Sequence, residues 1–235
     1  MDSCGQKSKV QKIEVETSDW KEDVQGLPGE EMMLQLILRV VADVGFVGLP
    51  NAGKSSLLAS LSRARPEIAP YPFTTLIPNL GVMGCGGDPV LVDLPGLIEG
   101  AHVGRGLGRN FLRHLRRTRM LLQVIDASLP DPVTDYETIR EELRMYNPQY
   151  CERLHLVALN KIDLVQSPER LGEMMDGIRG VAQNLRGRCP SASVPSHIIL
   201  TNALEGTGAD EVQRAIEEAL RDGRVEETGW GEWDE

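Results

Sequence analysis

The sequence predicts an α/β fold with a doubly wound, mostly parallel sheet. Two observations lead to this prediction. Five short apolar segments read as strands covered on both faces, at 36–47, 89–93, 121–126, 154–160 and 197–201. Helical patterns separate them, at 54–62, 107–118, 135–146, 168–185 and 209–221. Strands and helices that alternate at this length are typical of a parallel sheet with helices on its faces.

Each element has its own signal in chain order. The first strand leads through a glycine-rich loop into the first helix, and the second strand, PVLVD, ends at an aspartate. The strands LLQVID, LHLVALN and HIILT follow. The last helix begins after GTG and repeats Val212, Ile216 and Leu220 four residues apart, which gives it one apolar face.

Composition narrows the class of protein. The chain has 235 residues, of which 41% are hydrophobic and 26% charged, with a net charge of −10. This composition is typical of globular proteins and argues against wrapping nucleic acid over the whole surface. We expect no membrane span, because no apolar run approaches about 20 residues, and no secretory signal. Four scattered cysteines indicate free thiols in a reducing compartment, which is the cytoplasm, or a chloroplast or mitochondrion for an organellar protein.

A phosphate-binding loop stands between the first strand and the first helix. Residues 48–55 read GLPNAGKS and match GxxxxGK[ST]. Such a loop gathers backbone N–H groups around phosphates at a helix N-terminus, and Gly48 and Gly53 permit a backbone that a Cβ would obstruct. Lys54 would reach the β- and γ-phosphates, and Ser55 would bind Mg²⁺.

The base is predicted from residues 160–163, which read NKID at the end of a strand. Ligands bind at this edge of open α/β sheets. The Asp163 carboxylate can accept hydrogen bonds from the ring N–H and the amine of guanine, a donor pair that adenine lacks. Asn160 would brace the loop, and the Lys161 stem would lie over the base. GTP is therefore favoured over ATP.

Four longer segments of the sequence resemble those of one protein family. They read ADVGFVGLPNAGKSSLL (42–58), YPFTTLIPNLG (71–81), DLPGLIEGAHVGRGLGRNFLRHLRRTR (93–119) and NKIDL (160–164). With the DxxG element at 93–96, the chain resembles the Obg family of translation-associated GTPases. The resemblance implies a Ras-like P-loop GTPase domain with a six-stranded sheet and helices on both faces. It also implies Mg²⁺-dependent hydrolysis of GTP to GDP and a switch function in ribosome assembly.

Family roles carry over residue by residue. Thr75 matches the threonine that binds Mg²⁺ and closes over the γ-phosphate, Asp93 would hold Mg²⁺ through water, and the Gly96 N–H would contact the γ-phosphate. The expected metal ligands are therefore Ser55, Thr75 and Asp93, and the expected catalytic residues are Asn51, Lys54, Thr75 and Gly96. The expected nucleotide-binding residues are Gly48, Leu49, Pro50, Asn51, Ala52, Gly53, Lys54, Ser55, Ser56, Phe73, Thr74, Thr75, Leu76, Ile77, Asp93, Leu94, Pro95, Gly96, Asn160, Lys161, Ile162, Asp163, Asn202 and Ala203.

Three departures from the family pattern stand out. The glycine-rich N-terminal domain of the family is absent, so the chain is either truncated or from a shortened branch. The final guanine loop reads Asn202-Ala203 where the family has Ser-Ala, and the Ala203 N–H would still contact the guanine oxygen. The family's C-terminal region is either absent or replaced by an acidic tail. The expected division is an N-terminal extension at 1–30, the GTPase domain at 31–224 and the tail at 225–235.

Hydrolysis must proceed without the glutamine of Ras-like enzymes, because Leu97 follows DxxG. One interpretation is slow turnover, on the order of 10⁻⁴ to 10⁻³ per second. In another, Asn51 holds a K⁺ beside the phosphates, as the loops of potassium-dependent GTPases do; alternatively, Asn51 braces the loop. His102 and Glu99 are polar switch residues that nothing in the sequence places at the γ-phosphate.

An arginine stripe follows the switch. One helical face carries the arginines Arg109, Arg113, Arg116 and Arg117. This face suits contact with a ribosomal subunit, with ribosomal RNA phosphates or with an acidic partner; alternatively, it is a solvated surface. The other expected partners are GTP and GDP. We also expect the chain to be monomeric. The alternative function is a binding module that senses guanine nucleotides, including ppGpp, with incidental hydrolysis.

Overall fold

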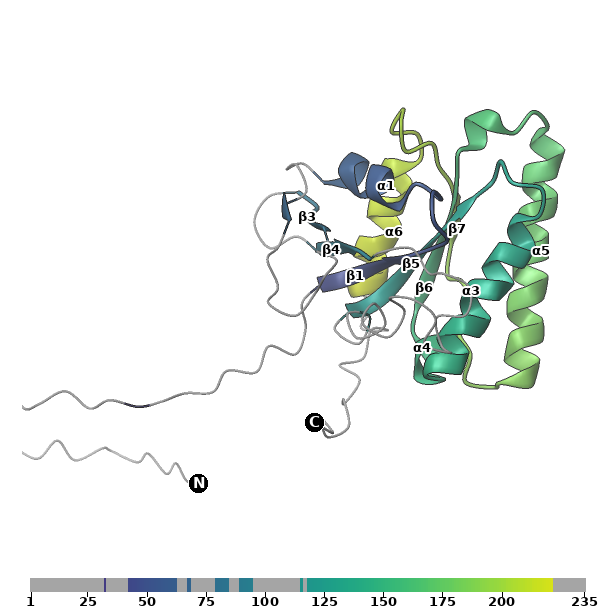
Figure 1. The fold of residues 1–235 in the computed structure, drawn as a ribbon, viewed down its shortest axis with the longest axis horizontal. Coiled ribbons are helices and arrows are strands. Elements are labelled where there is room, and N and C mark those ends of the chain that lie inside the picture. Colours follow the sequence, from purple (N-terminus) through teal and green to yellow (C-terminus); the bar gives the residue numbers. More distant parts are fainter. Residues whose placement is uncertain are drawn as a thin grey trace, which may run out of the picture. The chain divides into compact units, whose positions relative to one another are not determined.

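The fold was determined as a computed structural model. It describes residues 32, 42–62, 67–68, 79–84, 89–94, 115 and 118–221. Within them, seven strands form one sheet in the order β2-β3-β4-β1-β5-β6-β7 (Figure 1). The strands are β1 (Ala42–Val47), β2 (Glu67–Ile68), β3 (Asn79–Val82), β4 (Val90–Asp93), β5 (Thr118–Asp126), β6 (His155–Asn160) and β7 (Ile198–Leu200). The helices are α1 (Lys54–Leu61), α3 (Pro132–Tyr146), α4 (Gln149–Glu152), the 3-10 helix η2 (Ile162–Leu164), α5 (Pro168–Arg188) and α6 (Ala209–Arg221).

The five strands expected from the sequence pair in parallel. β1 lies between β4 and β5, and β6 and β7 extend the sheet. β2 and β3 add an antiparallel edge next to β4. The family resemblance implies a sixth strand, but the sequence patterns did not locate either of these two. Their signal is weak because β2 has two residues and β3 contains Asn79 and Gly81. The α/β fold class is confirmed, with the two-residue β2 as a strand beyond the six expected.

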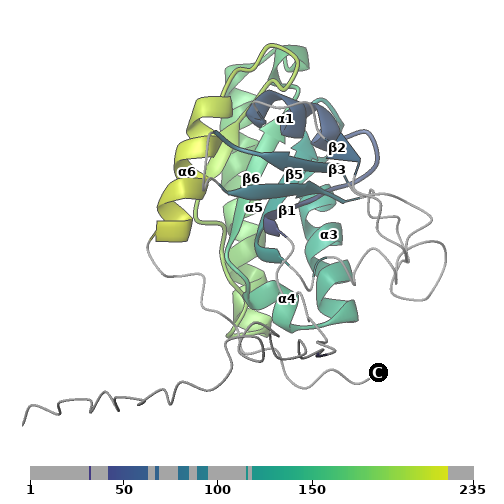
Figure 2. The same ribbon diagram turned by 90° about the vertical axis from the view of Figure 1, so that its left-hand side faces the viewer.

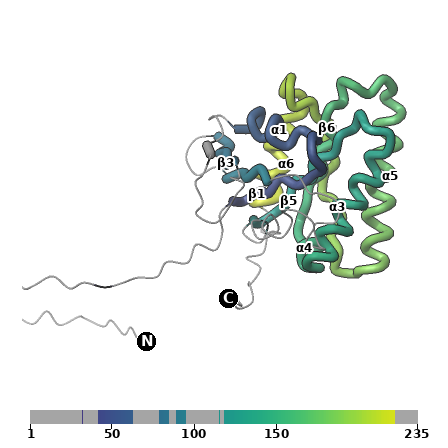
Figure 3. Tube along the Cα trace, in the orientation of Figure 1, coloured from purple at the N-terminus to yellow at the C-terminus, as the bar shows by residue number. Residues whose placement is uncertain are grey.

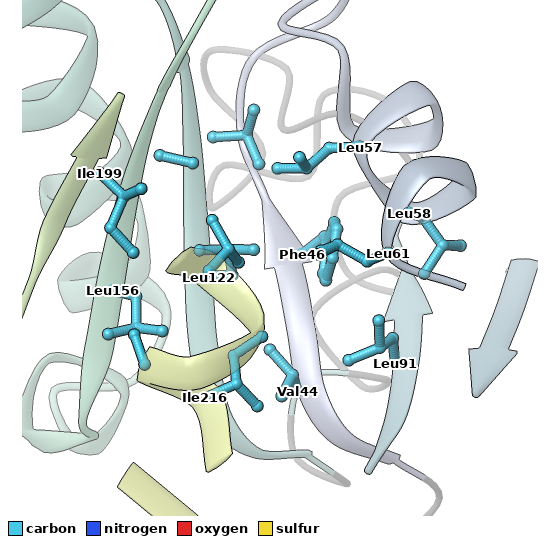
Figure 4. Packing of buried hydrophobic residues seen from close by; sticks show 14 of the residues in the cluster. Val44, Phe46, Leu57, Leu58, Leu61, Leu91, Leu122, Leu156, Ile199 and Ile216 are labelled. Carbon is cyan, nitrogen blue, oxygen red and sulfur yellow. The ribbon is translucent and has the colours of Figure 1, made fainter. Parts of the chain in front are cut away.

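Helices cover both faces of the sheet. α1 and α6 pack together on one face, and α3 and α5 pack together on the other (Figure 2). The core under α1 and α6 contains one hydrophobic cluster, which includes Val44 and Phe46 of β1, Leu57 of α1 and Ile216 of α6 (Figure 4). Burial on both faces explains why these strands are nearly continuous hydrophobic runs.

Each of the two long helices extends three residues beyond its predicted range, because α3 begins at Pro132 rather than at residue 135 and α5 ends at Arg188 rather than at residue 185. In α3, the Asp131 side chain accepts a hydrogen bond from the Thr134 N–H at 3.1 Å, and Pro132 takes the first helical position. In α5, Pro168 opens the helix and Arg188 is its last residue. Within the described parts of the chain, no helix combines the length and apolar character that crossing a bilayer requires.

The helix predicted at 107–118 lies mostly outside the described residues. Leu115 is helical and buried, but Thr118 is the first residue of β5, so the prediction was wrong at its end. The Thr118 hydroxyl donates to the Leu115 carbonyl at 2.9 Å, and Thr118 pairs with Ala42 of β1. A β-branched residue that terminates the helix and joins the sheet accounts for the shift.

Candidate functional site

The loop between β1 and α1 has the geometry of a phosphate-binding loop. A Cβ at Gly48 would lie 2.4 Å from the Val124 carbonyl oxygen, so only glycine fits beside β5. Gly53 has a φ of +93°, and a Cβ there would lie 2.2 Å from Asn160 Nδ2. Asn51 adopts a φ of +64° and is exposed. The loop thus delivers the chain to the N-terminus of α1, whose first N–H groups have no partner within the helix.

Lys54 is nearly buried at the start of α1, with 7% of its surface exposed. Its ammonium donates to the carbonyl oxygens of Gly48 at 3.1 Å and Leu49 at 2.9 Å. Burial lowers the pKa of Lys54, and the nearby Asp93 carboxylate opposes that shift. The lysine is therefore curled over the loop, where phosphate oxygens can replace its carbonyl partners.

Ser55 and Asp93 lie side by side next to this lysine. The Ser55 hydroxyl donates to Asp93 Oδ2, while Asp93 Oδ1 is buried and lacks a partner with good hydrogen-bond geometry among the described residues. Burial raises the pKa of Asp93, and the Ser55 hydroxyl, Lys54 and the Asn79 side chain oppose that shift. A hydroxyl and a carboxylate with a spare oxygen are the hard oxygen donors that Mg²⁺ prefers, so these residues fit the metal.

The Asn160 side chain joins the two loops. It is 2% exposed, and its Nδ2 donates to the Ala52 carbonyl at 2.9 Å. Its Oδ1 accepts from the Ala203 N–H at 3.0 Å and from the Thr201 hydroxyl at 3.3 Å. One amide therefore ties the phosphate loop to the end of β6 and to the loop after β7. Because the Ala203 N–H already donates to Asn160 Oδ1, it is not free in this structure to make the expected contact with guanine.

Lys161 has a partner that the sequence analysis missed. Its ammonium pairs with Asp126 Oδ2 at 2.5 Å, and Asp126 Oδ1 accepts from the Ser128 N–H and hydroxyl at 3.0 and 2.6 Å. Burial acts to raise the pKa of Asp126, but the hydrogen bonds from Lys161 and Ser128 outweigh it and leave the pKa below its ordinary value. The signal was present, because Asp126 ends a buried strand as Asn160 does. Asp163, in η2, is exposed.

These segments line one cleft of about 460 Å³. Its lining residues are Asn51, Gly53, Lys54, Ser55, Ser56, Asn160, Lys161, Asp163, Leu164, Asn202, Ala203 and Leu204. Leu204, at 86% exposure, is a wall residue that the sequence analysis missed. The Asn202 side chain instead accepts from the Leu204 N–H at 3.1 Å and stabilises its own turn.

Other predicted site residues lie elsewhere. Leu94 is completely buried in the core that also contains Val92 and Leu121, so its side chain serves packing. Leu49 is half-buried, and Pro50 is exposed. Several predicted residues lie outside the described residues: Phe73, Thr74, Thr75, Leu76, Ile77, Pro95, Gly96, Leu97, Glu99, His102, Arg109, Arg113, Arg116 and Arg117.

Comparison with known proteins agrees with this geometry. Residues 43–161 match the family model described as "50S ribosome-binding GTPase". The chain is 49% identical over 238 residues to "Probable GTP-binding protein OBGC2" of Oryza sativa subsp. japonica, covering 84% of this chain and 47% of that protein. It is 59% identical over 142 residues to "GTPase Obg" of Trichormus variabilis, covering 60% and 42%. The chain thus spans about half the length of the curated relatives it matches.

Solved structures show the same fold at low sequence identity. The G domain of the FeoB iron transporter of T. maritima superposes with a TM-score of 0.52 at 20% identity, over 76% of this chain and 98% of that chain. Era of Aquifex aeolicus has a TM-score of 0.51 at 23% identity, over 75% and 56%. The family match over about half of the chain, together with such similar plant and cyanobacterial relatives, shows that the chain belongs to the Obg family of GTPases.

Proposed function

We propose that the chain binds GTP with Mg²⁺ and hydrolyses it slowly to GDP, acting as a switch. The observation that carries this proposal is the Asn160 amide, which bonds to Ala52 of the phosphate loop and to Ala203 beside the base site. A nucleotide needs both halves at once, and one cleft of about 460 Å³ holds them together. That volume lies within the usual range for a ligand pocket.

Recognition of the base rests on Asp163 in this proposal. Its carboxylate is exposed at the cleft, where it can accept two hydrogen bonds from guanine. The Lys161 ammonium is paired with the Asp126 carboxylate. The aliphatic stem of Lys161 can therefore cover the base while the ammonium remains paired. These residues select guanine over adenine by hydrogen-bond pattern rather than by shape.

Mg²⁺ would be held by Ser55 and, through water, by Asp93, with Thr75 as the third ligand that the family resemblance implies. The spare oxygen of Asp93 supports this assignment. When bound, the ion neutralises charge that develops on the phosphate oxygens. Lys54 adds a second positive charge there, and the N–H groups of the loop and of Gly96 would hold the γ-phosphate.

Asn51 is our candidate for a further cation, K⁺. Its side chain makes no hydrogen bond within the described part of the chain and lies at the cleft, which favours a cation ligand over a loop brace. A cation there would supply positive charge in the transition state without an arginine. His102 and Glu99 take no part in this proposal.

We further propose that the partner is the large ribosomal subunit, because the matching family model is described as a 50S ribosome-binding GTPase. The arginine stripe Arg109, Arg113, Arg116 and Arg117 is the surface we expect to contact ribosomal RNA. The competing function is sensing of guanine nucleotides such as ppGpp, which would use the same cleft.

The deciding experiment measures GTP hydrolysis with and without purified large ribosomal subunits. We expect slow release of phosphate from the chain alone and faster release with subunits, and Lys54→Ala should abolish both. Subunits that leave the rate unchanged would favour nucleotide sensing. Hydrolysis equal for ATP and GTP would contradict the assignment of the guanine loop.

A further inference from the structure

Asp126 lies next to the nucleotide cleft without lining it. It ends β5 and is 7% exposed, while Lys161 and Asp163 on the neighbouring loop do line the cleft. β5 and β6 lie side by side in the sheet, and their register sets Asp126 opposite Asn160, the last residue of β6 (Figure 3). The Asp126 carboxylate is therefore placed beside the start of the loop to which we assign the base.

Both oxygens of the Asp126 carboxylate accept hydrogen bonds. Oδ1 accepts from the N–H and the hydroxyl of Ser128, at 3.0 and 2.6 Å. This short turn holds the carboxylate against its own chain and leaves Oδ2 to the Lys161 ammonium, 2.5 Å away. Hydrogen bonds between charged groups are the strong ones, and this bond joins the end of β5 to the residue that follows β6. The carboxylate is thus a fixed anchor for the lysine.

Lys161 has a backbone conformation that needs such an anchor. Its φ of +63° lies in the left-handed region, which residues with a Cβ adopt only at a cost. A residue of this kind persists only where its surroundings hold it. The next residue, Ile162, donates its N–H to the Thr201 carbonyl at 3.4 Å, a long bond that holds the loop weakly. The ion pair between Asp126 and Lys161 is the stronger of these two contacts.

The backbone of Lys161 also decides where Asp163 lies. Lys161 is the N-cap residue of η2, and the Leu164 N–H closes this helical turn on the Lys161 carbonyl at 3.1 Å. Asp163 stands in the middle of the turn. A rotation of the backbone at Lys161 therefore moves the Asp163 carboxylate relative to the rest of the cleft.

We infer that Asp126 is a positioning residue for recognition of the base. It holds the Lys161 ammonium, and through the left-handed backbone of Lys161 it fixes the turn that carries Asp163. This role rests on the proposed function, in which the Asp163 carboxylate accepts two hydrogen bonds from guanine. Asp126 acts through Lys161 and makes no contact with the nucleotide.

The test compares GDP with inosine diphosphate, which lacks the exocyclic amine that would donate to Asp163. Both nucleotides are titrated calorimetrically, with Mg²⁺, into the full chain and into Asp126→Asn, which keeps the size of the side chain but removes its charge. The variant should bind GDP about fivefold more weakly, the size of effect expected for one partly exposed ion pair, and should discriminate less between the two nucleotides. Equal losses for the two nucleotides, or no loss, would overturn the inference.

GTP turnover separates this role from a general structural one. For Asp126→Asn, the rate at saturating GTP should equal that of the parent, because Lys54 and Ser55 are unchanged, while the KM should rise about fivefold. Asp176→Asn is the matched control, because it removes an ion pair with Arg179 that lies at 2.9 Å on the exposed face of α5. It should change neither value. A lower saturated rate with an unchanged KM in Asp126→Asn would overturn the inference.

Lys161→Met tests whether Asp126 acts through the lysine. Methionine keeps an apolar stem beside the base but cannot pair with Asp126. This variant should lower the ratio of GDP to inosine diphosphate affinity as Asp126→Asn does, and the double variant should lose no more. Additive losses would show that Asp126 acts independently of Lys161. If circular dichroism shows that Asp126→Asn does not fold, Lys161→Met still decides, since the parent's ratio in this variant would overturn the inference.

These measurements also separate the positioning role from the proposed function. A parent chain that does not bind GDP would overturn both. A parent that prefers GDP to inosine diphosphate, with variants that bind both nucleotides as the parent does, would overturn only the role of Asp126.

Discussion

Removal of the Asn160 amide should destabilise the domain even before nucleotide binds. In Asn160→Ala, the Ala52 carbonyl and the Ala203 N–H lose partners that lie at 2.9 and 3.0 Å in a buried setting. A buried main-chain group without a partner costs about 1–3 kcal/mol, so the two together predict a loss of about 3 kcal/mol in the free energy of unfolding. That is a large share of the ~5–15 kcal/mol typical of a domain.

The assay is urea unfolding of the nucleotide-free chain, followed by far-ultraviolet circular dichroism. Asn184→Ala serves as the control, because Asn184 is exposed on α5 and its replacement should change stability by no more than about 0.5 kcal/mol. Asn160→Asp separates the two bonds, since it keeps the acceptor for Ala203 but turns an oxygen toward the Ala52 carbonyl. A loss below about 1 kcal/mol in Asn160→Ala would refute the brace as a source of stability.

Three further predictions follow from the site and the core. Asp163→Asn should weaken GTP binding by about 10- to 100-fold, because it removes a charge-assisted hydrogen bond to guanine. It should also shift the nucleotide preference to xanthosine triphosphate. Unchanged GTP affinity in a nucleotide titration would contradict the base assignment. GTP turnover should be faster in KCl than in NaCl at fixed ionic strength, and Asn51→Ala should remove that difference with little effect on GTP binding; equal parent rates would exclude the potassium site. Because burial lowers the pKa of His155, the unfolded chain binds the extra proton, so unfolding free energy should fall below about pH 6.5 by up to ~1.4 kcal/mol per pH unit. His155→Gln should flatten that pH dependence in urea titrations, and an unchanged slope would show that another group is responsible.

Local features of the sequence determined much of this protein. The loop at 48–55 needs only glycine at Gly48 and Gly53 and a helix behind it, and these signals lie within eight residues. The same holds for the parallel strands and their helices, because hydrophobic periodicity is set by neighbours along the chain. The assignment of Asp163 as the carboxylate that we propose to read the base was also local, because it depends on the four residues NKID after a strand.

Tertiary structure decided the contacts between distant segments. Asn160 reaches Ala52 across 108 positions, and Lys161 meets Asp126 because the β5–β6 register sets Asp126 opposite Asn160. Periodicity along the chain does not specify register or strand order. The sequence therefore marks Asp126 as the end of a buried strand, but it does not predict the pairing of Asp126 with Lys161, the position of the β2–β3 edge or the turn of Thr118 into β5. Arg140 is the clearest case. By sequence it is one arginine of an amphipathic helix, and only the packing of α3 against α4 and α5 leaves it buried without a counter-charge.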